Sequence, residues 1–130
     1  MGNPFQTPGA ISWHELLTGD VEAAKAFYAG LLGWEMETDI STGTEYTVVK
    51  AAGQPMGGMM RRPPECPPDL PPHWGIYITV EDVDATAAKA GELGGQVIHP
   101  AQDIPGVGRF AVLSDPQGAA FTVIKYASGT

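Results

Sequence analysis

The sequence DVEA at positions 20–23 recurs as DVDA at positions 82–85, and this repeat decides how the chain is organised. The offset of 62 residues continues well beyond these four positions. Self-similarity at a fixed spacing is typical of a supersecondary unit that occurs more than once. Two copies of one unit are therefore predicted. Applied along the chain, the offset pairs Leu16 with Ile78, Leu31 with Leu93, Gly33 with Gly95, Met36 with Ile98, Val48 with Phe110 and Met59 with Phe121.

Each copy predicts one strand, one helix and then three more strands. Apolar and other residues alternate in GIYITV at positions 75–80, the period of two that indicates a strand. Asp20 and Asp82 then stand where helix N-caps are expected, and glycines follow where the helices should end. DPQG at 115–118 has the residues that a type I turn prefers. The strands are expected at residues 13–17, 34–38, 45–51 and 56–60, and at 75–80, 96–99, 109–114 and 119–126.

The predicted fold class is α+β, with two tandem βαβββ modules in a single domain of residues 9–126. The modules are expected at residues 9–62 and 73–126. Six prolines in the ten residues 63–72 forbid a helix or a central strand there, which predicts an extended linker between the modules. A chain of 130 residues with 43% hydrophobic and 17% charged residues is expected to fold as one ordinary globular domain.

Composition also limits the partners. A net charge of −8 repels phosphate backbones and anionic lipids, so neither nucleic acid nor a membrane surface is an expected partner. No signal peptide or membrane-spanning run is seen, and the single cysteine, Cys66, cannot form an internal disulfide. These features favour a cytoplasmic location.

The helix ending FYAGLLGW at 27–34, the element order and the turn DPQG at 115–118 together resemble the vicinal oxygen chelate superfamily of glyoxalases, bleomycin-resistance proteins and extradiol dioxygenases. The resemblance covers residues 9–126, nearly the whole chain. It implies a curved mixed sheet around a cleft, with the helices on its outer face, and it implies homodimers. A further similarity, at residues 74–77 and 106–112, is to a poorly characterised branch labelled hydroxylase-like or glyoxalase-like.

Enzymes of this superfamily hold a divalent metal with His, Glu or Gln from the first and last strands of each module. In this chain the resemblance places those positions at Trp13, Met60, Gly75 and Thr122, none of which is a usual ligand for such a metal. We therefore predict no metal at the family site and no cofactor. A shift of one residue would make His14 a ligand, but it would also turn the strand over, so this alternative is less favoured.

The remaining cleft candidates centre on Glu15. A carboxyl group between Trp13 and Leu17 can act as an acid or a base, or it can form a structural ion pair with Arg109. Tyr77, the counterpart of Glu15 in the second copy, either donates a hydrogen bond to a ligand or fills space with its ring. The predicted ligand-binding residues are Trp13, Glu15, Met60, Tyr77, Arg109 and Thr122.

Three functions are compatible with this pattern. The first is binding of a small organic molecule in a cleft, without a metal. The second is an enzyme of the isomerase, lyase or dioxygenase type, which uses Glu15 as an acid or base or holds a metal at a site that the pattern does not reveal. The third, an interaction module, ranks last because no segment is marked as a docking site.

Overall fold

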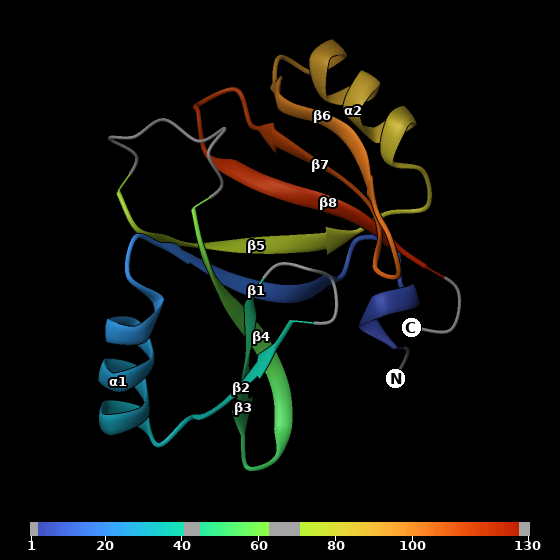
Figure 1. Cartoon of the computed structure of the whole chain (residues 1–130). Helices are drawn as coiled ribbons and strands as arrows, with labels where there is room; N and C mark the ends of the chain where they lie inside the picture. Colours follow the sequence, from blue (N-terminus) through green and yellow to red (C-terminus); the bar gives the residue numbers. More distant parts are fainter. Residues whose placement is uncertain (1–2, 41–44, 63–70, 128–130) are drawn as a thin grey trace. The chain divides into compact units, whose positions relative to one another are not determined.

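The computed structural model describes residues 3–40, 45–62 and 71–127, which form eight strands and two α-helices (Figure 1). They divide into two compact units, His14–Gly75 and a second unit of Met1–Trp13 with Ile76–Thr130. A 3-10 helix, η1 (Pro4–Gln6), precedes the strands. The elements are β1 (Ile11–Thr18), α1 (Val21–Leu32), β2 (Glu35–Asp39), β3 (Tyr46–Ala51), β4 (Gln54–Arg61), β5 (His73–Thr79), α2 (Val83–Glu92), β6 (Gln96–Ile104), β7 (Gly108–Ser114) and β8 (Ala120–Tyr126).

The order strand, helix, strand, strand, strand occurs twice, which confirms the predicted α+β class and its mixed strand pairing. In the unit His14–Gly75 the strands are hydrogen-bonded in the order β2-β3-β4-β1, and β1 runs parallel to β4. In the other unit the order is β6-β7-β8-β5, and β5 runs parallel to β8. The two units therefore share one topology.

The helices begin and end where the sequence predicts. The Asp20 carboxylate accepts a hydrogen bond from the Ala23 amide, and the Asp82 carboxylate accepts one from the Ala85 amide. Each bond satisfies an amide that the first helical turn leaves without a partner. Gly33 ends α1 with a φ of 72°, the left-handed conformation that glycine adopts without steric cost.

Each unit has its own small core between sheet and helix. Leu16, Val49 and Met59 are buried together in the first unit, with residues of α1 packed against them. Val83, Ala111, Leu113 and Val123 form the corresponding cluster beside α2. Because side chains alternate along a strand, the residues between these positions lie on the opposite face of each sheet.

The predicted offset of 62 residues is wrong in the last two strands of each module. Val48 is paired with Gly58 in the first module, and Val112 is paired with Thr122 in the second. Val112 is therefore the counterpart of Val48 and Thr122 that of Gly58, and both are separated by 64 residues. The buried positions agree, since Val49 matches Leu113 and Met59 matches Val123. The register of β6 against β7 shifts twice, at Val97/His99 and His99/Gln102, whereas β2 pairs with β3 without a shift. Such irregularities add residues to one strand, so the counterpart of Thr122 is Gly58 and not Met60.

Strand β6 is also longer than predicted. The sequence predicts that this strand ends at His99, because Pro100 has no amide hydrogen to donate to a neighbouring strand. The strand nevertheless continues to Ile104. Pro100 lies inside the second register shift, between His99 and Gln102, where the ladder has no paired residue, so the proline does not interrupt the pairs on either side. The linker residues 63–70 lie outside the described part of the chain, and the predicted domain and module boundaries stay predictions. Of the described helices, none is long and apolar enough to cross a membrane.

Candidate functional site

Glu15 is a buried carboxylate in the middle of β1, with 8% of its surface exposed. It lies opposite Gly58 in the parallel β1–β4 ladder, on the face of the sheet that looks away from α1. The hydroxyl of Tyr46, on β3, donates a hydrogen bond of 2.8 Å to its Oε2 atom. A buried carboxylate without hydrogen bonds would be costly, so this bond offsets part of the cost of burying Glu15.

Gly58 makes the contact between Tyr46 and Glu15 possible. A Cβ atom at position 58 would collide with the hydroxyl and ring carbons of Tyr46. The phenol ring therefore occupies the space that a side chain at position 58 would take. Tyr46 is not among the predicted site residues, although its two-residue spacing from Val48 on a predicted strand places both on one face.

The neighbours of this pair on the same face are apolar. Leu17 lies opposite Met60 in the β1–β4 ladder, and Val48 lies opposite Gly58 in the β3–β4 ladder. Leu17, Val48, Met60 and the ring of Tyr46 are each half-buried. One carboxylate and one hydroxyl group therefore lie among apolar and polarisable side chains. This combination is typical of sites that bind small organic molecules.

In the other unit, the predicted residues Tyr77 and Thr122 lie side by side as partners in the parallel β5–β8 ladder. Both are half-buried, on the face opposite the α2 core. Phe110 lies on the same face, and its ring stacks on His99 with 5.4 Å between centroids. The Nδ1 atom of His99 lies 2.8 Å from the Pro100 carbonyl oxygen.

Trp13 lies among aromatic rings. The ring of Phe5, in η1, is 6.3 Å from that of Trp13 and packs edge-on against Tyr126 at 4.9 Å. The Tyr126 hydroxyl is also 2.7 Å from the Ser12 hydroxyl, which lies 2.9 Å from the Thr79 hydroxyl. This network anchors η1 to its unit, because the Thr79 hydroxyl donates to the Pro4 carbonyl oxygen.

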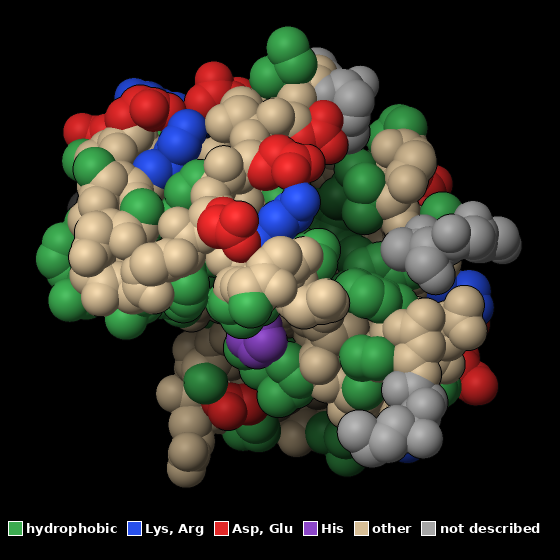
Figure 2. Space-filling view, turned by 90° about the horizontal axis from the view of Figure 1, so that it is seen from below, with side chains coloured by type: hydrophobic (Ala, Val, Ile, Leu, Met, Phe, Trp, Pro, Cys, Tyr) green, Lys and Arg blue, Asp and Glu red, His purple; other side chains and the backbone are tan. Residues whose placement is uncertain are grey.

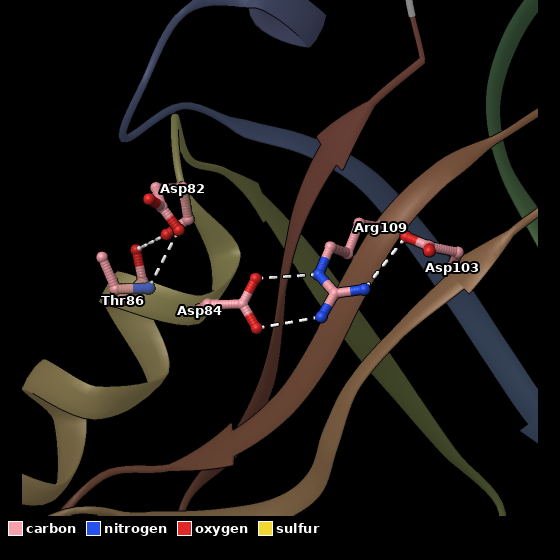
Figure 3. Close-up of polar contacts among 6 residues, drawn as sticks. Asp82, Asp84, Thr86, Asp103 and Arg109 are labelled. Atoms are coloured by element: carbon pink, nitrogen blue, oxygen red, sulfur yellow. Dashed lines mark hydrogen bonds and ion pairs between the residues drawn. The ribbon is translucent and has the colours of Figure 1, made fainter.

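Arg109 lies on the other face of the sheet from the one predicted. It shares the α2-facing side of β7 with Ala111 and Leu113, and its guanidinium donates two hydrogen bonds of 2.9 Å to Asp84 in the first turn of α2. A third bond, of 3.1 Å, goes to Asp103 (Figure 3). Arg109 is therefore paired with two aspartates and not with Glu15, the predicted alternative, and it is no part of the candidate site.

On the face of the molecule drawn in Figure 2, acidic and basic side chains lie next to one another.

This ion pair predicts a change of stability at acid pH. The hydrogen bonds from Arg109 hold the pKa of Asp84 below its ordinary value of 3.8. A carboxyl group with a lowered pKa in the folded state stabilises the fold fully above its ordinary pKa, and this contribution is lost as the pH falls through the lowered value. Asp84→Asn should therefore lower the melting temperature at neutral pH, and the gap to the wild type should close as the pH falls below 3.8.

Melting curves between pH 7 and pH 2 check this expectation. Glu92→Gln removes a carboxylate from the other end of α2, where the structure gives this side chain no partner among the described residues. Its curve should run parallel to that of the wild type. A constant gap between Asp84→Asn and the wild type down to pH 2 would show that the pair does not stabilise through its charge.

The family metal site does not fit the residues present. After the correction of register, the ligand positions are Trp13, Gly58, Gly75 and Thr122. An indole N–H has no lone pair to donate, glycine has no side chain, and a threonine hydroxyl is a poor ligand for the metals that suit His and Glu. In the described part of the chain, no group of three or more His, Cys, Asp or Glu side chains is placed to hold a metal ion. His14 is exposed, with its Nδ1 3.2 Å from the Met56 carbonyl oxygen.

Comparison with known proteins identifies the family. A model of the Glyoxalase/Bleomycin resistance protein/Dioxygenase superfamily matches residues 10–123. The chain belongs to this superfamily. It is 50% identical over 118 residues to a protein of Mycobacterium tuberculosis named putative glyoxylase CFP32, covering 90% of this chain and 44% of that protein. It is 34% identical over 128 residues to the anthracycline biosynthesis protein DnrV of Streptomyces peucetius, covering 89% of this chain and 46% of that protein. The chain thus spans about half the length of these superfamily relatives.

Solved structures of the superfamily fold are similar at lower identity. A methylmalonyl-CoA epimerase of Mycobacterium tuberculosis has a TM-score of 0.61 and 14% identity, covering 94% of this chain and 91% of its own. A variant methylmalonyl-CoA epimerase of Streptomyces coelicolor, in complex with 2-nitronate-propionyl-CoA, has a TM-score of 0.63 and 18% identity. The match covers 94% of this chain and 100% of the epimerase chain. These similarities establish the fold and not the activity.

Proposed function

We propose that this superfamily member binds a small, largely apolar organic molecule without a metal ion, on the face of the β1–β4 sheet that looks away from α1. The observation that carries the proposal is the buried Glu15 carboxylate, hydrogen-bonded by Tyr46 and surrounded by half-buried apolar side chains. The poor fit of the family ligand positions supports binding through protein groups alone. The residues proposed to contact the molecule in this unit are Glu15, Tyr46 and Met60, with Leu17 and Val48 as apolar neighbours.

The predicted residues of the other unit remain a separate proposal, for the corresponding face of that unit. Trp13, Tyr77 and Thr122 are proposed as ligand contacts, because aromatic rings and a hydroxyl suit the same kind of molecule. The names of the relatives, a glyoxylase and an anthracycline biosynthesis protein, are compatible with small organic ligands. The predicted homodimer and cytoplasmic location remain predictions.

Catalysis is the second candidate function, and the hydrogen-bonded pair of Glu15 and Tyr46 favours it as well. A carboxylate that accepts a hydrogen bond from a phenol can take up a proton from a substrate at Glu15 while the hydroxyl keeps the carboxylate in place. Glu15 is the residue that we expect to act as the acid or base in that case. Turnover that Glu15→Gln abolishes, with binding kept, would favour the enzyme over the binder.

The test of the proposal is a titration with 4-nitrophenol, a small apolar ring with one hydroxyl, at a pH where the phenol is neutral. Quenching of tryptophan fluorescence reports binding. We expect saturable binding to the wild type, and Glu15→Gln should weaken it about tenfold or more, since a hydrogen bond to a charged group contributes about 1.5–3 kcal/mol.

Metal analysis of the purified protein completes the test. We expect no stoichiometric metal, and no rise of melting temperature with zinc, nickel, manganese or iron(II) salts. Stoichiometric metal together with a raised melting temperature would contradict metal-free binding. If Glu15→Gln and the wild type bind 4-nitrophenol with equal affinity, the proposed role of Glu15 is contradicted.

A further inference from the structure

We propose that Tyr46 is a specificity-determining residue of this site, and that the site selects ligands that carry a hydroxyl group on an apolar ring. The inference rests on the proposed function and deepens it, because it gives Tyr46, which is neither a family ligand position nor one of the predicted site residues, a role in ligand selection. Its basis is the contact between Tyr46 and Glu15 across Gly58.

Gly58 is the structural counterpart of Thr122, the last-strand position at which the superfamily resemblance places a metal ligand. In this chain the phenol ring of Tyr46 occupies the space of a side chain at position 58. A protein hydroxyl therefore stands where a metal-binding side chain would otherwise begin, so at this one of the four family positions Tyr46 takes the space that a metal ligand would need.

The Tyr46 hydroxyl uses its single hydrogen to donate to Glu15 Oε2, so towards a ligand its oxygen can act only as an acceptor. An ionised carboxylate is also only an acceptor. A ligand that meets this pair must bring the donor, and the apolar neighbours Leu17, Val48 and Met60 favour a ring over a sugar or a charged group.

A deprotonated acid would meet the Glu15 carboxylate in a protein whose net charge is −8, and this repulsion disfavours anions. The ligand class that remains is a neutral aromatic molecule with a hydroxyl group. Tyr46 acts here as a positioning residue, because it holds the Glu15 carboxylate in one orientation towards that hydroxyl.

The experiment compares 4-nitrophenol with nitrobenzene, which has the same ring and lacks the hydroxyl. We expect the wild type to bind 4-nitrophenol about tenfold more tightly than nitrobenzene, and Tyr46→Phe to reduce this ratio to about threefold or less. The ratio is the decisive readout, because general damage to the fold weakens both probes alike. Tyr28→Phe is the matched control, since the Tyr28 hydroxyl accepts a hydrogen bond from Trp74 beside α1, and it should keep the wild-type ratio.

The outcomes separate the inference from the proposed function. If the wild type prefers 4-nitrophenol, Glu15→Gln weakens binding and Tyr46→Phe leaves the ratio unchanged, the role of Tyr46 is refuted while the proposed function stands. If the wild type binds both probes equally, the selection for a hydroxyl is refuted. If the wild type binds neither probe, the proposed function is refuted for small aromatic rings, and the inference falls with it.

Discussion

Replacing Gly57 with alanine is expected to destabilise the protein by about 3 kcal/mol, or to prevent it from folding. Gly57 is buried in β4, opposite His14 in the parallel β1–β4 ladder. A Cβ atom at this position would collide with the carbonyl oxygen of His14 and would lie 3.2 Å from its carbonyl carbon. These are backbone atoms of a hydrogen-bonded strand, and they cannot move aside without separating β1 from β4.

Urea denaturation of Gly57→Ala and the wild type measures this loss. Gly30→Ala is the matched control, because it makes the same chemical change in the same unit at a position in α1 where a Cβ atom meets nothing within 4 Å. Alanine favours a helix over glycine by up to about 1 kcal/mol, so the control should be more stable than the wild type. A Gly57→Ala protein of wild-type stability would show that β1 and β4 are further apart than the structure places them.

The sequence was a good guide to the fold for a physical reason. Capping aspartates, terminal glycines and alternating strands are local signals, and both copies contain them, as Asp20 and Asp82 illustrate. The offset of 62 failed from β6 onward, where two register shifts add residues in a number that no local pattern in the sequence gives. Because a two-residue shift keeps each side chain on its face, the apolar pattern gave no warning of the error.

Less of the candidate site than of the fold could be predicted from the sequence. Glu15 could be placed by strand alternation, and the structure puts it on the expected face. Tyr46 could not be found in this way, because its contact with Glu15 depends on a glycine of a third strand. Arg109 was selected as a cation near a predicted carboxylate, but its partner Asp84 lies on a helix whose position against β7 is set by tertiary packing.

Gly58→Ala is expected to remove the preference for a hydroxyl-bearing ligand as fully as Tyr46→Phe does. Here the obstructing atoms belong to the side chain of Tyr46, and a side chain can rotate away. The phenol ring should leave its place and lose its hydrogen bond to Glu15, at a cost to stability of about 1–2 kcal/mol, which is less than for Gly57→Ala. The measurement is the ratio of the 4-nitrophenol and nitrobenzene affinities, together with urea denaturation.

A double-mutant cycle tests the cause of that effect. If the ring of Tyr46 fills the space at position 58, the cost of Gly58→Ala should fall to near zero once Tyr46→Ala has emptied that space. The two changes should then be non-additive by about 1 kcal/mol or more, as is expected of residues in direct contact. Additive losses would mean that the ring does not lie over Gly58. In that case Glu15 would have to be held by other groups, and the glycine at position 58 would serve only the packing of β4 between β1 and β3.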